Sequence, residues 1–393
     1  MIGHDPRIAG EMIEHAVVAG LLSTGCKVQR TGMVPTPTLA LASKECGCGI
    51  MITASHNPAR YIGMKVFRNG MSLDTGQQEE VEALLDNGNF KRAEWGMTGN
   101  LGIMGTAVRD HSDIILKNTG SSDLKVVVDC GCGAASVITP YILREMGCEV
   151  ITLNSQPDGY FPGREPEPVD ENLKLLKSTV KAAGADLGIA HDGDADRMMA
   201  VDDQGRFVSG DKMLAFFAVR EAKKAIAVPV DTSRVVDDLL NGIKISRTKV
   251  GDVYVAEMLK KINGEFGGEP SGAWIFPKIS LCPDGIYAAA RLVEIVENEG
   301  KFSDLLCTIP EYPVKRYAFQ CADKKKAMIK IAEKLKRLGD INTLDGVRVD
   351  IEDGWILIRP SGTEPKIRIT VESKDRCDEL YEKAEDIVKG AIA

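Results

Sequence analysis

Residues 186–197 read DLGIAHDGDADR, a short apolar run that leads directly into a loop with three aspartates. The run 186–190 has the length of a buried strand. The segments before it alternate in type: strand 125–129, helix 134–146, strand 149–153 and helix 170–183. Strands that alternate with helices of this length form parallel sheets joined by crossover helices. We therefore predict an α/β domain whose aspartates lie at the carboxyl end of a strand, where open α/β sheets bind their ligands.

The alternation of strands and helices extends to both sides of this domain. We expect a helix at 11–24, a strand at 50–53, a helix at 75–86, strands at 225–230 and 244–248, and helices at 252–262 and 285–298. The last part of the chain differs, because its strands follow one another directly. It is expected to contain a helix at 323–338, strands at 346–351, 354–358 and 366–372, and a helix at 374–391. These patterns predict domains at 1–118, 119–212, 213–311 and 312–393, the last of them of α+β type.

The composition excludes several classes of protein. Of 393 residues, 49 are Lys or Arg and 57 are Asp or Glu, so the formal charge is −8. No basic excess is present to neutralise phosphates, so nucleic acid is not expected as a partner. No apolar run approaches the roughly 18 residues of a membrane span, and the start MIGHDPRIAG lacks the pattern of a signal peptide. We expect a cytoplasmic protein with no membrane partner and with reduced cysteines.

The aspartate loop has the chemistry of a cation site. Asp192, Asp194 and Asp196 stand at alternate positions, and carboxylates this close repel one another unless a cation neutralises them. Carboxylate oxygens suit Mg²⁺ or Ca²⁺. An EF-hand is excluded, because its required Gly and Glu are replaced by Arg197 and Asp203. A solvated acidic turn is the alternative, but the position after a strand favours metal binding.

Two further loops place polar side chains within reach of a ligand. TASHNP (53–58) follows the apolar run 50–53 and carries Ser55 next to His56. It lacks the G-x-S-x-G pattern of a hydrolase nucleophile, and a turn that ends a strand is the alternative. GEPSG (268–272) carries Glu269 and Ser271, which can hydrogen-bond to sugar hydroxyls, although alone it is typical of a turn.

The loop RPSGTEPK (359–366) has the composition of an anion site. Ser361, Gly362 and Thr363 can offer backbone N–H groups and hydroxyls, and Arg359 and Arg368 bracket them with positive charge. A plain hairpin turn is the alternative. Because Mg²⁺ is usually held by few carboxylates together with substrate phosphate oxygens, the acidic and basic loops together predict a phosphate-bearing substrate.

In this order, TASHNP, DGDADR, GEPSG and RPSGTEPK resemble the four site loops of the α-D-phosphohexomutase superfamily. That superfamily includes phosphoglucomutase, phosphomannomutase and phosphoglucosamine mutase, and the resemblance covers essentially the whole chain. It implies an α/β protein of three mixed-sheet α/β domains and a C-terminal α+β domain around a central cleft. In chain order, these would be a phosphoserine, a metal-binding, a sugar-recognition and a phosphate-binding domain.

The resemblance also implies a role for each loop. Ser55 would carry a phosphoryl group and, with Asp192, Asp194 and Asp196, would hold one Mg²⁺. The other implied roles are as follows: Glu269, Ser271, Thr248 and Gly251 (the last two from TKVGD, 248–252) orient the sugar; Arg359, Ser361, Gly362, Thr363 and Arg368 grip the substrate's other phosphate; Arg7 lines the site and binds substrate; and His56, Lys65 and Arg197 line the site as catalytic residues.

The implied reaction interconverts hexose 6-phosphate and hexose 1-phosphate. Phospho-Ser55 would transfer its group to the substrate, and a hexose 1,6-bisphosphate intermediate, which also serves as activator, would turn over and return the other phosphate. Lys65 or His56 would be the general acid or base. The strings VGDVYV (250–255) and GEPSG favour glucosamine phosphate slightly, whereas GNFKRAEW (88–95) and QPDGYFPG (156–163) fit phosphomannomutase or phosphoglucomutase. The partner is a small sugar phosphate, and a monomer or homodimer is expected.

Departures from the family pattern leave other functions open. The chain joins the pattern at GHDPR (3–7), where the family has G-R-D-x-R, so the first domain is expected to lack edge strands and one substrate-binding Arg. YIGMK (61–65) stands in place of Y-N-G-I-K, and Ala273 in place of a His of bacterial glucosamine-type loops. The alternatives are an inactive sugar-phosphate binder and a Mg²⁺-dependent phosphatase that uses the aspartate loop.

Overall fold

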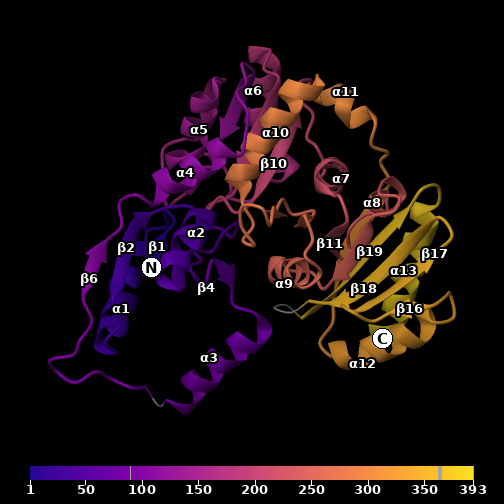
Figure 1. Cartoon of the computed structure of the whole chain (residues 1–393). Coiled ribbons are helices and arrows are strands. Elements are labelled where there is room, and N and C mark those ends of the chain that lie inside the picture. Colours follow the sequence, from indigo (N-terminus) through magenta and orange to yellow (C-terminus); the bar gives the residue numbers. More distant parts are fainter. Residues whose placement is uncertain (89, 362–364, 393) are drawn as a thin grey trace.

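The computed structural model describes residues 1–88, 90–361 and 365–392, and its strands form four sheets that follow one another along the chain (Figure 1). The first three sheets combine a parallel centre with an antiparallel edge, and the fourth is antiparallel. The predicted class is therefore confirmed: three mixed-sheet α/β domains precede an α+β domain. The exact domain boundaries stay predictions.

The first sheet has the N-terminal strand near its centre. Its strands, in order across the sheet, are β5 (Met71–Ser72), β4 (Met64–Arg68), β3 (Cys48–Ile52), β1 (Ile2–His4), β2 (Val28–Met33) and β6 (Leu101–Ile103). Its helices are α1 (Gly10–Ser23), α2 (Thr36–Cys46) and α3 (Thr75–Asn87). Because β1 and β3 are parallel neighbours, the residues that follow His4 lie beside those that follow Ile52. The loop that carries Ser55 thus begins next to the turn that carries Arg7.

The second sheet has the order β10 (Met198–Asp202), β9 (Leu187–His191), β7 (Lys125–Asp129) and β8 (Glu149–Leu153). Its helices are α4 (Ala107–Lys117), α5 (Thr139–Met146) and α6 (Lys174–Ala183). The predicted single helix 134–146 is wrong: a 3-10 turn at Ala134–Val137 ends before α5 begins. Pro140 explains the break, because proline lacks an N–H and fits only the first turn of a helix.

The third sheet has the order β12 (Lys244–Thr248), β11 (Ala225–Pro229), β13 (Phe266–Gly268) and β14 (Trp274–Ile275). Its helices are α7 (Gly210–Glu221), α8 (Val235–Leu239), α9 (Asp252–Ile262), α10 (Gly285–Glu299) and α11 (Phe302–Cys307). Phe217 of α7 packs against Phe266, Trp274 and Phe276. One continuous apolar core joins this sheet to the second, since Val126 of β7 and Phe266 of β13 belong to the same buried cluster.

The fourth sheet has the order β15 (Val314–Gln320), β19 (Lys366–Ser373), β18 (Gly354–Pro360), β17 (Val347–Ile351) and β16 (Ile341–Asn342). Helices α12 (Lys324–Leu335) and α13 (Cys377–Ile392) cover it and close a core of its own (Figure 1). Trp355 and Leu357 pack against Val230, which follows β11. Strands β18 and β19 therefore belong to a separately packed domain that contacts the third. Within the described residues, no helix has the length and apolarity needed to cross a membrane.

Gly210 at the start of α7 positions the GEPSG loop. A Cβ atom at this glycine would overlap the carbonyl oxygen of Pro270. We expect Gly210→Ala to lower the melting temperature, since overpacking of this kind costs about 1–3 kcal/mol. Gly20→Ala is the matched control: Gly20 lies exposed in α1 with nothing near its Cβ position, so alanine should raise the melting temperature slightly. Calorimetry of the three proteins checks both, and a Gly210→Ala protein as stable as the wild type would contradict the packing.

Candidate active site

Two loops that lie 137 residues apart in sequence meet at the candidate site. Ser55 lies just beyond β3, and Asp192 follows β9 directly. The Ser55 hydroxyl donates a hydrogen bond to Asp192 Oδ2 at 2.7 Å. Ser55 has a φ of +50°, a left-handed conformation that a non-glycine residue keeps only where its surroundings impose it. The structure thus fixes the direction of this hydroxyl toward the aspartate loop.

Arg7 stabilises the Ser55 loop through hydrogen bonds to its backbone. Its guanidinium donates Nε to Asp5 at 3.0 Å, and both Nη groups donate to backbone carbonyls of the loop. These carbonyls belong to Ser55, Asn57, Pro58 and Tyr61. All five N–H donors of the guanidinium are therefore bonded within the protein, and the residue is 3% exposed. The sequence predicts that Arg7 binds substrate; the structure places it beneath the loop instead, as its support.

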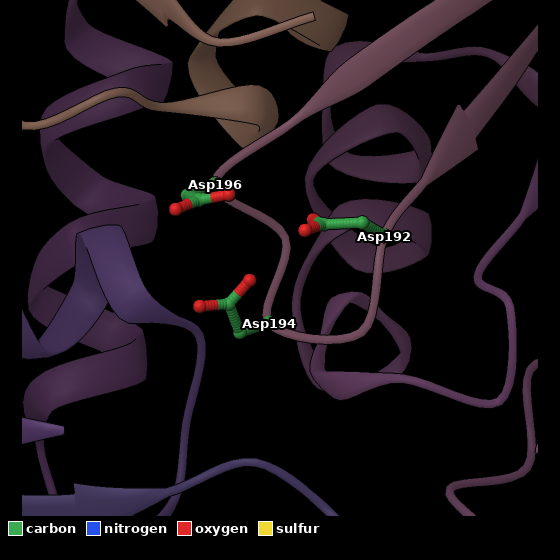
Figure 2. Close-up of side chains that lie close together, drawn as sticks. All are labelled: Asp192, Asp194 and Asp196. Atoms are coloured by element: carbon green, nitrogen blue, oxygen red, sulfur yellow. The ribbon is translucent and has the colours of Figure 1, made fainter. Parts of the chain in front are cut away.

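The three aspartates form a buried cluster. Asp192, Asp194 and Asp196 face a common space on the loop after β9 (Figure 2), and candidate ligand oxygens of the three lie within 4.8 Å of one another. The Oδ1 atoms of Asp194 and Asp196 are buried and have no hydrogen-bond partner among the described residues. Buried, unpartnered carboxylate oxygens are costly unless a cation takes them up. The residues therefore fit a hard divalent cation such as Mg²⁺.

Lys65 of β4 balances part of this negative charge. Its Nζ lies 2.8 Å from Asp194 Oδ2 and also bonds to Asp196 Oδ2. Burial alone would raise the pKa of Asp194, but the charge and hydrogen bond of Lys65 lower it below its usual value. Burial and the neighbouring carboxylates raise the pKa of Asp192 instead. One ammonium thus offsets only part of the charge of three carboxylates.

Arg197 completes the charge pattern. Burial opposes its charge, but Asp192 and Asp196 raise its pKa above the usual value. Its side chain forms no hydrogen bond to any described residue, and it lines the adjacent cavity. A guanidinium of this kind is available to an anionic ligand.

The two histidines near the aspartate loop differ in exposure. His56 Nδ1 lies 3.4 Å from Ser55 Oγ, and burial together with Arg197 lowers the pKa of His56 to about 4. His191 is fully buried between Thr139 and the carbonyl oxygen of Arg197, and burial lowers its pKa to about 4 as well. Both imidazoles are therefore neutral at pH 7. His56 can accept a proton beside Ser55, and His191 holds the shape of the aspartate loop.

A cavity of about 690 Å³ opens beside the aspartate loop. Gly251, Glu269 and Ser271, which the sequence predicts to bind the sugar, line this cavity. Glu269 Oε1 accepts a hydrogen bond from Gly251 N at 2.7 Å, and burial together with Asp252 raises the pKa of Glu269 to about 7. Thr248, predicted to be in this group, lies outside the lining: it is buried, and its hydroxyl donates to the carbonyl of Lys249.

Three arginines share one face of the fourth sheet. Arg359 and Arg368 are directly paired across β18 and β19, and Arg316 of β15 lies two residues from Ala318, the partner of Arg368 on the other side. They line a second cavity of about 560 Å³ that continues from the first. Like charges directly opposite each other destabilise a sheet, so an anion is the expected occupant. Ser361 is buried and is not among the residues that line this cavity, and the predicted Gly362 and Thr363 lie outside the described residues.

Two polar residues of the site were not predicted from the sequence. Thr36, at the start of α2, donates its backbone N–H to the carbonyl of Asp194 and its hydroxyl to Asp194 Oδ2 at 2.5 Å. Arg316 forms an ion pair with Asp211 of α7 at 3.1 Å. Thr36 carries no local signal, because its partner is 158 residues away. The sequence shows that the β15 segment is basic, but it does not show which residue of β15 pairs with Arg368.

The chain is similar to known proteins along its whole length. The sequence matches all four domains of the phosphoglucomutase/phosphomannomutase family: alpha/beta/alpha domain I at residues 1–92, domain II at 107–205, domain III at 209–312 and the C-terminal domain at 318–389. A probable phosphoglucosamine mutase of Methanosarcina acetivorans is 58% identical over 398 residues, which cover 100% of this chain and 92% of the relative. A second, from Methanococcoides burtonii, is 55% identical with the same coverage.

Solved structures agree with these matches. A phosphoglucomutase/phosphomannomutase family protein of Burkholderia thailandensis aligns with a TM-score of 0.85 and 28% identity, over 99% of this chain and 88% of the other. Parafusin, a phosphoglucomutase of Paramecium, aligns with a TM-score of 0.75 and 18% identity, over 99% and 87%. The second alignment bears on the fold alone.

The hydrogen bond from Thr36 to Asp194 should contribute to cation binding. A hydrogen bond to a charged group contributes about 1.5–3 kcal/mol, so Thr36→Val should weaken Mg²⁺ binding about 10- to 100-fold, measured by titration calorimetry. Thr36→Ser keeps the hydroxyl and is the control, with an affinity near that of the wild type. Equal affinity of the valine variant and the wild type would show that Asp194 is positioned without Thr36.

Proposed function

The chain belongs to the phosphoglucomutase/phosphomannomutase family and is a phosphomutase, an isomerase that moves a phosphoryl group within its substrate. On this basis we propose that it interconverts glucosamine 6-phosphate and glucosamine 1-phosphate through a phosphoserine at Ser55. The observation that carries the proposal is the hydrogen bond between Ser55 Oγ and Asp192, which joins a hydroxyl to a buried cluster of three carboxylates.

The proposed reaction has two transfers. In the first, the bond between phosphorus and the Ser55 oxygen breaks while the free hydroxyl oxygen of the sugar phosphate bonds to phosphorus. The resulting 1,6-bisphosphate turns within the cavity, and the second transfer returns the other phosphate to Ser55. Catalysis of phosphoryl transfer rests mainly on positioning and on neutralising charge. Arg316, Arg359 and Arg368 would hold the phosphate that does not react.

Ser55, Asp192, Asp194 and Asp196 would hold Mg²⁺, which when bound supplies charge neutralisation to the transferring phosphoryl group. The protein's own groups provide the rest. In each transfer a proton leaves the attacking hydroxyl and another reaches the leaving oxygen. His56 is neutral and can accept a proton, and as an imidazolium it could return one to the leaving oxygen. Burial lowers the pKa of Lys65, but Asp194 and Asp196 raise it well above its usual value, so Lys65 stays protonated and would supply positive charge beside the transferring group.

The choice of glucosamine phosphate rests on relatives at 55–58% identity that are named phosphoglucosamine mutases. Mannose and glucose phosphates are the other substrates that the family name suggests. We place the reaction in the cytoplasm, in keeping with ten cysteines that are all free.

Ser55→Ala should abolish mutase activity and leave the fold intact, because it removes only one oxygen from a buried loop. A coupled assay with glucosamine, mannose and glucose 6-phosphates measures turnover, and intact mass reports whether a phosphate is present on the wild type. Ser23→Ala, on the exposed end of α1, is the control and should behave as the wild type. Turnover by the Ser55→Ala protein above about 1% of the wild type would refute the phosphoserine.

Asp194→Asn should weaken Mg²⁺ binding and lower kcat together, by about 100-fold or more. The change removes one ligand charge and also the partner of Lys65, and loss of one member of a buried pair costs about 3–5 kcal/mol. Activity is measured across a range of Mg²⁺ concentrations. Asp86→Asn, an exposed position in α3, is the control. An unchanged Mg²⁺ requirement would exclude the loop as the metal site.

A further inference from the structure

The 690 Å³ cavity has an unusual charge for a site that receives phosphate esters. Six carboxylates and three guanidiniums line it: Glu167, Asp170, Asp211, Asp231, Asp252 and Glu269, against Arg197, Arg316 and Arg368. Phosphate esters are anions, so a net excess of carboxylates opposes their entry. A ligand that also carries a positive group would offset this opposition. The lining therefore points to a substrate with both an anionic and a cationic group.

Asp231 is the carboxylate best placed to receive such a group. It follows β11 and lines both the 690 Å³ cavity and the 560 Å³ arginine cavity, so it stands where sugar and phosphate would join. Its Oδ1 is buried and has no hydrogen-bond partner among the described residues. A buried acceptor without a partner in a folded protein calls for an explanation, and a donor on the ligand provides one.

The other carboxylates near this junction already have partners. Asp211 is paired with Arg316 at 3.1 Å, and Glu269 accepts the hydrogen bond of Gly251 N. Arg316 and Arg359 lower the pKa of Asp231, although burial raises it more strongly. Neither arginine forms a hydrogen bond with Asp231 in the described structure. The negative charge of Asp231 therefore weakens anion binding at the arginine cavity, although Asp231 forms no hydrogen bond to Arg316 or Arg359. A purely structural role for Asp231 does not explain this arrangement.

We propose that Asp231 determines substrate specificity by accepting a hydrogen bond from the ammonium group of a hexosamine phosphate. In glucosamine 1-phosphate the ammonium is on the carbon next to the one that carries the phosphate. A phosphate held by Arg316, Arg359 and Arg368 therefore brings the ammonium close to the carboxylate that shares their cavity. A neutral hexose would offer only a hydroxyl there, and a hydrogen bond between charged groups is roughly twice as strong as a neutral one. This inference rests on the proposed function and adds the residue that selects the sugar.

The test compares two substrates in the wild type and in Asp231→Asn. With wild-type protein, kcat/KM for glucosamine 1-phosphate should exceed that for glucose 1-phosphate by about 10-fold or more. The asparagine variant should lose about 10-fold with glucosamine 1-phosphate and be unchanged or better with glucose 1-phosphate, because the opposing charge is gone. Asp304→Asn, at an exposed position in α11, is the control and should keep the wild-type ratio.

The outcomes separate the inference from the proposed function. Equal losses with both substrates would mean that Asp231 only shapes the arginine cavity, and an unchanged ratio would mean that it does not contact the amino group; either result overturns the inference while the mutase remains. If the wild-type protein has nearly equal kcat/KM values for the two substrates, the inference is overturned without any variant. This comparison tests the inference even where the Asp231→Asn protein does not fold. Absence of mutase activity with every hexose phosphate would instead refute the proposed function.

Discussion

Repulsion among three buried carboxylates is the constraint on which the rest of the site depends. The aspartates of the loop after β9 lie with their oxygens within 4.8 Å, and the first domain supplies the groups that make this arrangement tolerable. Thr36, Ser55 and Lys65 each donate a hydrogen bond to one or two of them. The contacts that neutralise the loop are therefore also the contacts that position the serine. A cation bound there would take over a charge balance that Lys65 provides only in part.

Positive charges lie close together at the arginine cavity, the part of the site opposite the aspartate loop. Arg359 and Arg368 face each other across two strands, where like charges destabilise the sheet, and Arg316 adds a third positive charge to the same face. Asp211 pairs with Arg316 and Asp345 pairs with Arg359, so carboxylates of the described residues offset part of this positive charge. In the function we propose, a sugar phosphate would suit both ends of the site, because its phosphates would bind at the arginines and at the cation site in turn. The carboxylates of the 690 Å³ cavity would then influence which sugar is accepted.

The site loops could be predicted because each is a local pattern: an apolar run followed directly by polar residues that a strand end would expose. Ser55 and the aspartates were found in this way. Thr36 could not be, because its role comes from a contact with a residue 158 positions away. Arg7 was visible as a basic residue, but the pattern does not show that its donors turn inward to four carbonyls. The break before α5 can be read from Pro140, because proline fits only the first turn of a helix.

The inward turn of Arg7 has a mechanical consequence. A single guanidinium bonds four backbone carbonyls of the Ser55 loop at once. The left-handed φ of Ser55 can persist only because the loop is held in this way. A serine that is fixed before the ligand arrives presents the same in-line geometry to every hydroxyl brought to it. In the reaction we propose, which has two different acceptors, the sugar would then be the part that turns, and the cavity would have to admit it in both orientations. Any asymmetry between the two orientations would therefore arise in the ligand and in the carboxylates that line the cavity, and not in Ser55.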